Sequence, residues 1–225
     1  MWRLETNLGE PLPDLARLLQ QLNEQADFFA NERPLLLARA PGRLDLMGGI
    51  ADYSGSLVLE LPLACATYVL AQPDETRELR VRTLNADGGM APEVALPLDE
   101  LLPTAGALDY ASAGALLTAE RRWAWAAYVL GTLVVLQRER GWRPRAGLRL
   151  LISSEVPIGK GVGSSAALEV AAMHAICGVW GWDLAPRELA LLCQKVENRI
   201  VGAPCGVMDQ MTCACGQKDR LLALR

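Results

Sequence analysis

The stretch Pro157–Leu168, "PIGKGVGSSAAL", decides how the rest of the chain is interpreted. It follows an apolar, strand-like run, Gly147–Val156, and leads directly into an apolar run with a helical pattern. Glycines allow positive φ and a close approach of the backbone to an anion, and the free N–H groups of a helix's first turn attract negative charge. The stretch therefore predicts a strand, an anion-binding turn and a helix, although a plain glycine-rich turn capped by serine gives the same pattern.

The position of Lys160 separates this turn from the nucleotide-binding P-loop, in which a lysine directly precedes a serine or threonine. Here Lys160 precedes Gly161, and Ser164 and Ser165 follow only later. We expect Lys160 to be solvated at the tip of the loop, with contact to a phosphate as the alternative. Because the turn alone does not identify a ligand, other parts of the chain have to supply the evidence.

Two further stretches carry charged residues within glycine- and proline-rich sequence. The first is predicted to leave a buried strand at Pro41-Gly42 and to continue as a loop that carries Arg43, Asp45, Asp52 and Tyr53. The second, Gln194–Met211, places Glu197 at the end of a helix and Asp209 after a glycine-containing loop. A carboxylate in an apolar setting is costly unless it is paired or functional, and capping of a short helix is the alternative role of Asp209.

The remaining pattern indicates the fold class. Leucines at helical spacing predict a helix over Leu12–Glu32. Other apolar runs predict strands at 56–63, 65–72, Glu78–Asn85, near Val94, Gly147–Val156 and 219–225. Helices are predicted at Trp123–Arg140, Ser165–Val179 and Pro186–Val201. Most of Ala86–Gly114 is predicted to form loops. A block of strands followed by helices that alternate with few strands predicts an α+β fold, in which a mixed sheet has helices packed on one face.

Composition narrows the class of protein. The 225 residues are 51% apolar, which suffices for a packed core, and their net charge of −4 argues against nucleic-acid binding. The chain opens without an apolar signal segment, and the apolar run Trp123–Leu136 is shorter than the roughly 20 residues that a membrane-spanning helix needs. Among the six cysteines, Cys177 and Cys193 lie in apolar, helix-like runs. We therefore expect a cytoplasmic protein with reduced thiols that contacts neither nucleic acid nor a membrane.

Three stretches, taken in order, resemble the motifs of the GHMP small-molecule kinases, and in particular those of the galactokinase and L-arabinokinase branch. The phosphate-binding motif resembles the stretch 157–171, "PIGKGVGSSAALEVA". The sugar-binding signature resembles the stretch 40–55, with "APGRLDLMGG" and "ADYSG". The segment of the catalytic aspartate resembles the stretch 197–211, "ENRIVGAPCGVMDQM". The resemblance implies a GHMP kinase N-terminal domain over residues 35–225, preceded by a helical extension over residues 1–34.

The resemblance also implies roles for individual residues. Asp209 would accept the proton of the anomeric hydroxyl, and Arg43 would stand beside Asp209 and the transferred phosphoryl group. The phosphates of ATP would be held by Pro157, Gly159, Gly161, Gly163, Ser164, Ser165 and Ala166. Mg²⁺ would be ligated by Ser165 and Glu197, and the sugar would be contacted by Arg43, Asp52, Tyr53, Gly206 and Asp209. For Tyr53 and Asp45, packing and turn formation are alternatives.

The substrate depends on the segment Gly48–Tyr53. Where galactokinases read Gly-Glu-His-x-Asp-Tyr, this chain has Gly49 and Ile50 in place of the two polar residues, which suits a pentose without a hydroxymethyl group. The resemblance implies conversion of L-arabinose to L-arabinose 1-phosphate by ATP and Mg²⁺; a D-galactose 1-kinase and a non-catalytic sensor of sugar and ATP are the alternatives. A third glycine-rich motif is missing, so we expect an absent C-terminal domain and an exposed apolar strand edge at Leu221–Arg225.

Overall fold

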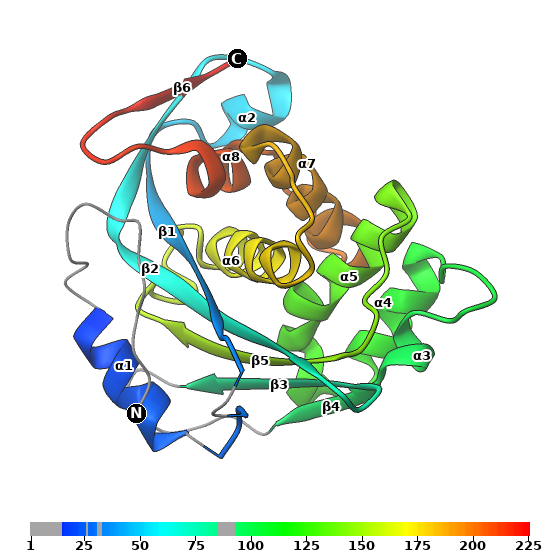
Figure 1. The fold of residues 1–225 in the computed structure, drawn as a ribbon. Helices are drawn as coiled ribbons and strands as arrows, with labels where there is room; N and C mark the ends of the chain where they lie inside the picture. The colour runs from blue at the N-terminus through cyan, green and yellow to red at the C-terminus, as the bar shows by residue number, and fades with distance from the viewer. Residues whose placement is uncertain (1–14, 26, 31–32, 85–92) are drawn as a thin grey trace.

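The structure is a computed structural model that describes residues 15–25, 27–30, 33–84 and 93–225 of the chain. Within these residues, one mixed sheet has the strand order β1-β2-β5-β3-β4, and a short strand, β6, pairs with the far end of β2 (Figure 1). The strands are β1 (Leu36–Met47), β2 (Val58–Asp74), β3 (Glu78–Leu84), β4 (Val94–Pro97), β5 (Gly147–Ser154) and β6 (Leu222–Leu224). Within the described residues, only β3 and β5 pair in parallel; the other strand pairs are antiparallel.

Helices cover the sheet unequally on its two faces. The larger core joins one face to a group of helices and turns: α3 (Leu98–Leu101), α4 (Tyr110–Thr118), the 3₁₀ turn Arg121–Ala126, α5 (Ala127–Arg140), α6 (Ser164–Trp180), α7 (Pro186–Val196) with the π-helical turn Glu197–Val201, and α8 (Met208–Cys215). The short helix α2 (Ile50–Ser54) follows β1. On the opposite face, only α1 (Leu15–Glu24) packs against the sheet in the described part of the chain (Figure 1).

The two cores follow from the alternation of side chains along a strand. On β2, Val69 and Ala71 face the helices, whereas Tyr68 and Leu70 face α1. The prediction of an α+β fold with a mixed sheet and helices on one face is confirmed, and α1 is an addition on the other face. The boundary predicted at residue 34 stays a prediction.

The sequence predicted that strand β1 ends at Pro41-Gly42, and that prediction is wrong. The strand continues to Met47 across an irregularity in the pairing: Pro41 faces Ala66, but Arg43 faces Pro62, so Gly42 lies opposite three residues of β2. Because proline lacks an N–H group, it is tolerated in a sheet at such an irregularity. Arg43 and Asp45 therefore lie on a strand and not in a loop.

The two strands predicted at 56–63 and 65–72 are also wrong as separate elements, because β2 runs through both. Helices α3 and α4 occupy part of a region that was expected to be loop, and Asp109 caps α4 by accepting a hydrogen bond from Ser112 N at 2.8 Å. The helix predicted at Leu12–Glu32 ends at Glu24 within the described residues. The predictions of β3, β4, β5, α6 and β6 are confirmed to within a few residues.

No helix among the described residues is long and apolar enough to cross a membrane. The apolar run Trp123–Leu136 instead forms a 3₁₀ turn and most of α5, and α5 is largely buried from Ala127 to Leu136. This run is therefore a core helix, as its length indicated.

Candidate active site

The turn between β5 and α6 has the backbone that its glycines predict. Gly159, Gly161 and Gly163 all have φ between 66° and 70°, a region in which other residues are strained. Helix α6 begins at Ser164 directly after Gly163, which has no side chain to cap the first-turn N–H groups. The serine-capped turn is therefore wrong, and the helix end is open to an anion. Lys160 is exposed, as expected.

Arg43 connects this turn to strand β1. Its backbone N–H donates to Val162 O at 2.9 Å, and its Nη1 donates to Gly161 O at 2.6 Å. A Cβ atom placed on Gly163 would lie 3.0 Å from Arg43 Cγ. The turn and the guanidinium are thus packed in contact, although they are more than a hundred residues apart in the chain.

The same guanidinium is paired with Asp209, the second residue of α8. Arg43 donates to Asp209 Oδ1 from Nε at 2.8 Å and approaches the same oxygen with Nη2 at 2.6 Å. Burial raises the pKa of Asp209, and the Arg43 charge opposes that rise. Asp209 keeps 25% of its side chain exposed, so an incoming group can reach it.

Asp52, on α2, holds the start of α8. Its Oδ2 accepts a hydrogen bond from Met208 N at 3.1 Å. Capping of this helix was the alternative role considered for Asp209, but Asp52 makes the contact instead. Gly206 lies against the same carboxyl group: a Cβ atom there would be 1.9 Å from Asp52 Oδ2. Tyr53 is 64% exposed and donates to Pro204 O at 3.2 Å. Asp52 thus contacts Gly206 and the residue before Asp209, whereas its sequence neighbour Tyr53 contacts Pro204 in the loop before α8.

Ser165 and Glu197, the predicted Mg²⁺ ligands, also lie together. Glu197 is buried, which raises the pKa of its carboxyl group, and a hydrogen bond with Ser165 opposes that rise. Gln210 donates to Glu197 Oε2 at 2.7 Å. In the described residues, no group of three or more histidine, cysteine, aspartate or glutamate side chains is arranged to hold a metal ion.

Two buried carboxyl groups beside the site were missed by the sequence analysis. Glu169, one turn after Ser165 on α6, is fully buried, and its burial raises its pKa well above the ordinary value. Gln210 donates to it at 3.3 Å. Glu60, on β2, is also fully buried and lies 3.5 Å from Arg43 Nε. Their signal in the sequence is a glutamate inside an otherwise apolar run, which is costly without a local reason.

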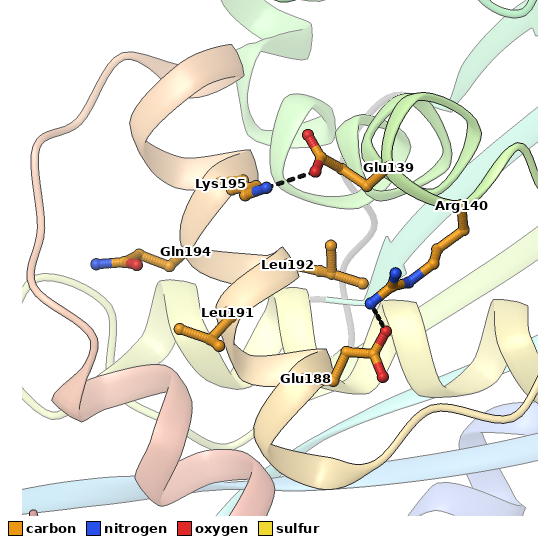
Figure 2. A pocket seen from close by; sticks show the side chains of 7 residues that line it. All are labelled: Glu139, Arg140, Glu188, Leu191, Leu192, Gln194 and Lys195. Atoms are coloured by element: carbon orange, nitrogen blue, oxygen red, sulfur yellow. Dashed lines mark hydrogen bonds and ion pairs between the residues drawn. The ribbon is translucent and has the colours of Figure 1, made fainter.

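A cavity of about 260 Å³ lies elsewhere, between α5 and α7 (Figure 2). Its charged side chains neutralise one another: Lys195 pairs with Glu139 at 2.5 Å, and Arg140 pairs with Glu188. Leu191 and Leu192 supply its apolar lining. Since none of its residues belongs to the predicted set, the candidate active site is the Arg43–Asp209 region and not this cavity.

Family models match both halves of this arrangement. Residues 127–217 match the GHMP kinases N terminal domain, and residues 25–73 match the galactokinase galactose-binding signature. The first match contains the glycine-rich turn, Glu197 and Asp209, and the second contains Arg43 and Asp52. The chain therefore carries the N-terminal domain of a GHMP kinase.

Within that family, the similarity is to the galactokinase and L-arabinokinase branch. The chain is 44% identical to an Arabidopsis thaliana protein named L-arabinokinase, over 87% of this chain and 21% of that protein. It is 34% identical to a Chloroflexus aggregans galactokinase, over 87% of this chain and 45% of that protein. The crystal structure of Lactococcus lactis galactokinase complexed with galactose superposes with a TM-score of 0.74 at 27% identity, over 92% of this chain and 49% of that one. The chain thus spans less than half the length of these relatives.

Proposed function

We propose that this chain forms the nucleotide- and sugar-binding part of an ATP-dependent sugar 1-kinase, which phosphorylates the anomeric hydroxyl of a monosaccharide. The observation that carries the proposal is the position of Arg43, which contacts both the glycine-rich turn and Asp209. A phosphoryl donor bound at the turn and a hydroxyl group bound at Asp209 would therefore meet at one guanidinium. Phosphoryl transfer depends mainly on such positioning and on charge stabilisation.

The residues of the turn fit the phosphates of ATP. A Cβ atom on Gly159 or Gly161 would meet nothing within 4 Å, so the surface of the turn is open to a ligand. Helix α6 presents its uncapped N-terminus at the same place. We assign the phosphates to Pro157, Gly159, Gly161, Gly163, Ser164, Ser165 and Ala166.

The pair of Ser165 and Glu197 fits Mg²⁺. Both offer hard oxygen atoms, and Glu197 is a buried carboxyl group whose hydrogen-bond partners in the described residues, Cys205, Gln210 and Ser165, carry no positive charge. A bound Mg²⁺ would neutralise charge on the phosphates and on Glu197. Gln210 would keep Glu197 oriented through the hydrogen bond from Nε2.

Asp209 is proposed to orient the anomeric hydroxyl and to accept its proton. For this it has to be ionised, and the adjacent Arg43 favours the ionised form. Arg43 would also stabilise the charge that develops on the transferred phosphoryl group. General-base contributions of this kind are worth about 10²- to 10⁴-fold in rate.

For the sugar we propose L-arabinose, with D-galactose as the alternative. We assign contacts with the sugar to Asp52, Tyr53 and Gly206 on the α2 side; these residues contact one another or the loop and first residue of α8. Ile50 is 86% exposed, and Gly49 leaves open space where a side chain would stand. Residues 49 and 50 therefore offer no polar side chain that could bind the hydroxymethyl group of a hexose. The absence of such a side chain favours a pentose, which lacks that group. We also propose a cytoplasmic location, because the six cysteines are free thiols.

The test is an assay of ADP release with L-arabinose and D-galactose in parallel, run with an Asp209→Asn control. Because the relatives are longer, it is carried out on the chain alone and on the chain joined to the C-terminal part of an L-arabinokinase. Turnover with L-arabinose that is lost in the control supports the proposal. A clear preference for D-galactose overturns the choice of sugar, and ATP binding without turnover in both forms makes the protein a sensor.

A further inference from the structure

Glu60 is a carboxyl group enclosed beside the candidate active site. It lies on β2 with none of its side chain exposed. Neither of its oxygens accepts a hydrogen bond from any N–H group in the described part of the chain, and Arg43 Nε is 3.5 Å from Oε2. A single cation at this distance compensates a buried carboxylate only in part, so the protonation state of Glu60 matters to its neighbours.

A second carboxyl group, that of Asp45, lies beside Glu60 in the sheet. The two residues are direct cross-strand partners on β1 and β2. They approach over Gly48, because a Cβ atom on that glycine would lie 2.7 Å from Asp45 Oδ1 and 2.8 Å from Glu60 Oε1. Two ionised carboxylates in this position repel each other, whereas one proton between them converts the contact into a hydrogen bond.

The charges around Glu60 come from two elements. Arg43 and Asp45 face it from β1, and Asp209 acts on it from α8. Burial and the charge of Asp45 raise the pKa of Glu60 to about 7, although Arg43 opposes the rise. Of the two carboxyl groups, Asp45 is the more exposed, and it already accepts a hydrogen bond from Gly49 N at 2.8 Å. Below about pH 7, Glu60 therefore holds a proton.

We propose that Glu60 is a positioning residue for phosphoryl transfer, which acts by controlling how much of the Arg43 charge is available to Asp209 and to the phosphoryl group. When Glu60 holds a proton and donates it to Asp45 in a hydrogen bond, Arg43 is paired with Asp209 alone. When that proton leaves to solvent, the Glu60 carboxylate competes with Asp209 for the Arg43 guanidinium and neutralises part of its charge. The inference rests on the proposed kinase function but not on the identity of the sugar.

The first test follows the protonation of Glu60 and needs no turnover, so its outcome is independent of whether the chain acts as a kinase. The carboxyl carbons of the full chain are followed by ¹³C NMR between pH 4 and pH 9. We expect a glutamate that titrates near pH 7, that is absent in Glu60→Gln, and that titrates at least one pH unit lower in Asp45→Asn. Titration of Glu60 near the ordinary value of 4.5, or no response to Asp45→Asn, overturns the proposal.

The second test is the pH profile of sugar-dependent ADP release. Wild-type kcat is expected to fall about fivefold between pH 7 and pH 8, as for a single required proton. Glu60→Gln mimics the protonated acid and is expected to remove this fall while KM stays within twofold. Glu78→Gln, at a partly exposed position on β3, is the matched control and keeps the wild-type profile. A fall of the same size in Glu60→Gln overturns the proposal; if that variant does not fold, the shift of the midpoint in Asp45→Asn decides.

Discussion

Arg43 and Asp209, which are 166 positions apart in the chain, are joined by two contacts from one guanidinium to one carboxylate oxygen, at 2.8 Å and 2.6 Å. The guanidinium also donates to Gly161 O. A single side chain thus joins strand β1, the turn before α6 and the first turn of α8. Because Arg43 is largely buried while Asp209 remains partly accessible, the arrangement holds the carboxylate in place and leaves it able to react.

Replacement of Asp209 by asparagine tests the reactive role of this pair. Asparagine keeps the size of the side chain and the contact with Arg43, but it cannot accept a proton. We expect kcat to fall by at least about a hundredfold, with ATP binding by calorimetry within threefold of wild type and an unchanged circular dichroism spectrum. Retention of more than a tenth of the wild-type kcat would show that Asp209 is not the base.

Replacement of Gly163 by alanine tests the contact between the turn and Arg43. Gly163 has φ of 70°, so alanine costs about 1–2 kcal/mol in backbone strain, and its Cβ would lie 3.0 Å from Arg43 Cγ. Gly181 is the matched control, because it ends α6 with φ of 67° and a Cβ there would meet nothing within 4 Å. Both variants are expected to lose similar stability in urea, but only Gly163→Ala is expected to lose ATP affinity. Equal loss of ATP affinity in the two would contradict the assigned contact.

Replacement of Glu169 by glutamine tests whether this buried acid is protonated. Burial raises the folded-state pKa of Glu169 above its ordinary value of 4.5. The folded chain therefore binds more protons than the unfolded chain, and its free energy of unfolding falls as the pH rises above that value. Glutamine does not ionise, so Glu169→Gln is expected to gain stability over wild type as the pH is raised from 5 to 8, measured as the difference in Tm. Glu75→Gln, at a position 80% exposed, is expected to show no such trend. A Tm difference for Glu169→Gln that is constant with pH would mean that Glu169 is ionised.

The sequence was sufficient to predict the segments of the site but not the contacts between them. Glycine spacing predicts the turn at Gly159–Gly163 because positive φ is a local property. The continuation of β1 through Pro41-Gly42 was not predictable, because local proline and glycine signals are overridden when a neighbouring strand adjusts its register, as β2 does opposite Gly42. The partnership of Glu60 with Asp45 was missed for the same reason, since cross-strand neighbours depend on that register.

The contact between Gly206 and Asp52 makes a prediction that only a double variant can test. Gly206→Ala would place a Cβ atom 1.9 Å from Asp52 Oδ2, and we expect it to cost about 1–3 kcal/mol, as for overpacking. Asp52→Ala removes the cap on Met208 N and is expected to cost about 0.5–2 kcal/mol. Because the second change also removes the atoms that collide with the new Cβ, the double variant is expected to be no less stable than Asp52→Ala alone. The free energies of unfolding in urea measure this coupling, and simple addition of the two losses would mean that Gly206 and Asp52 are not in contact.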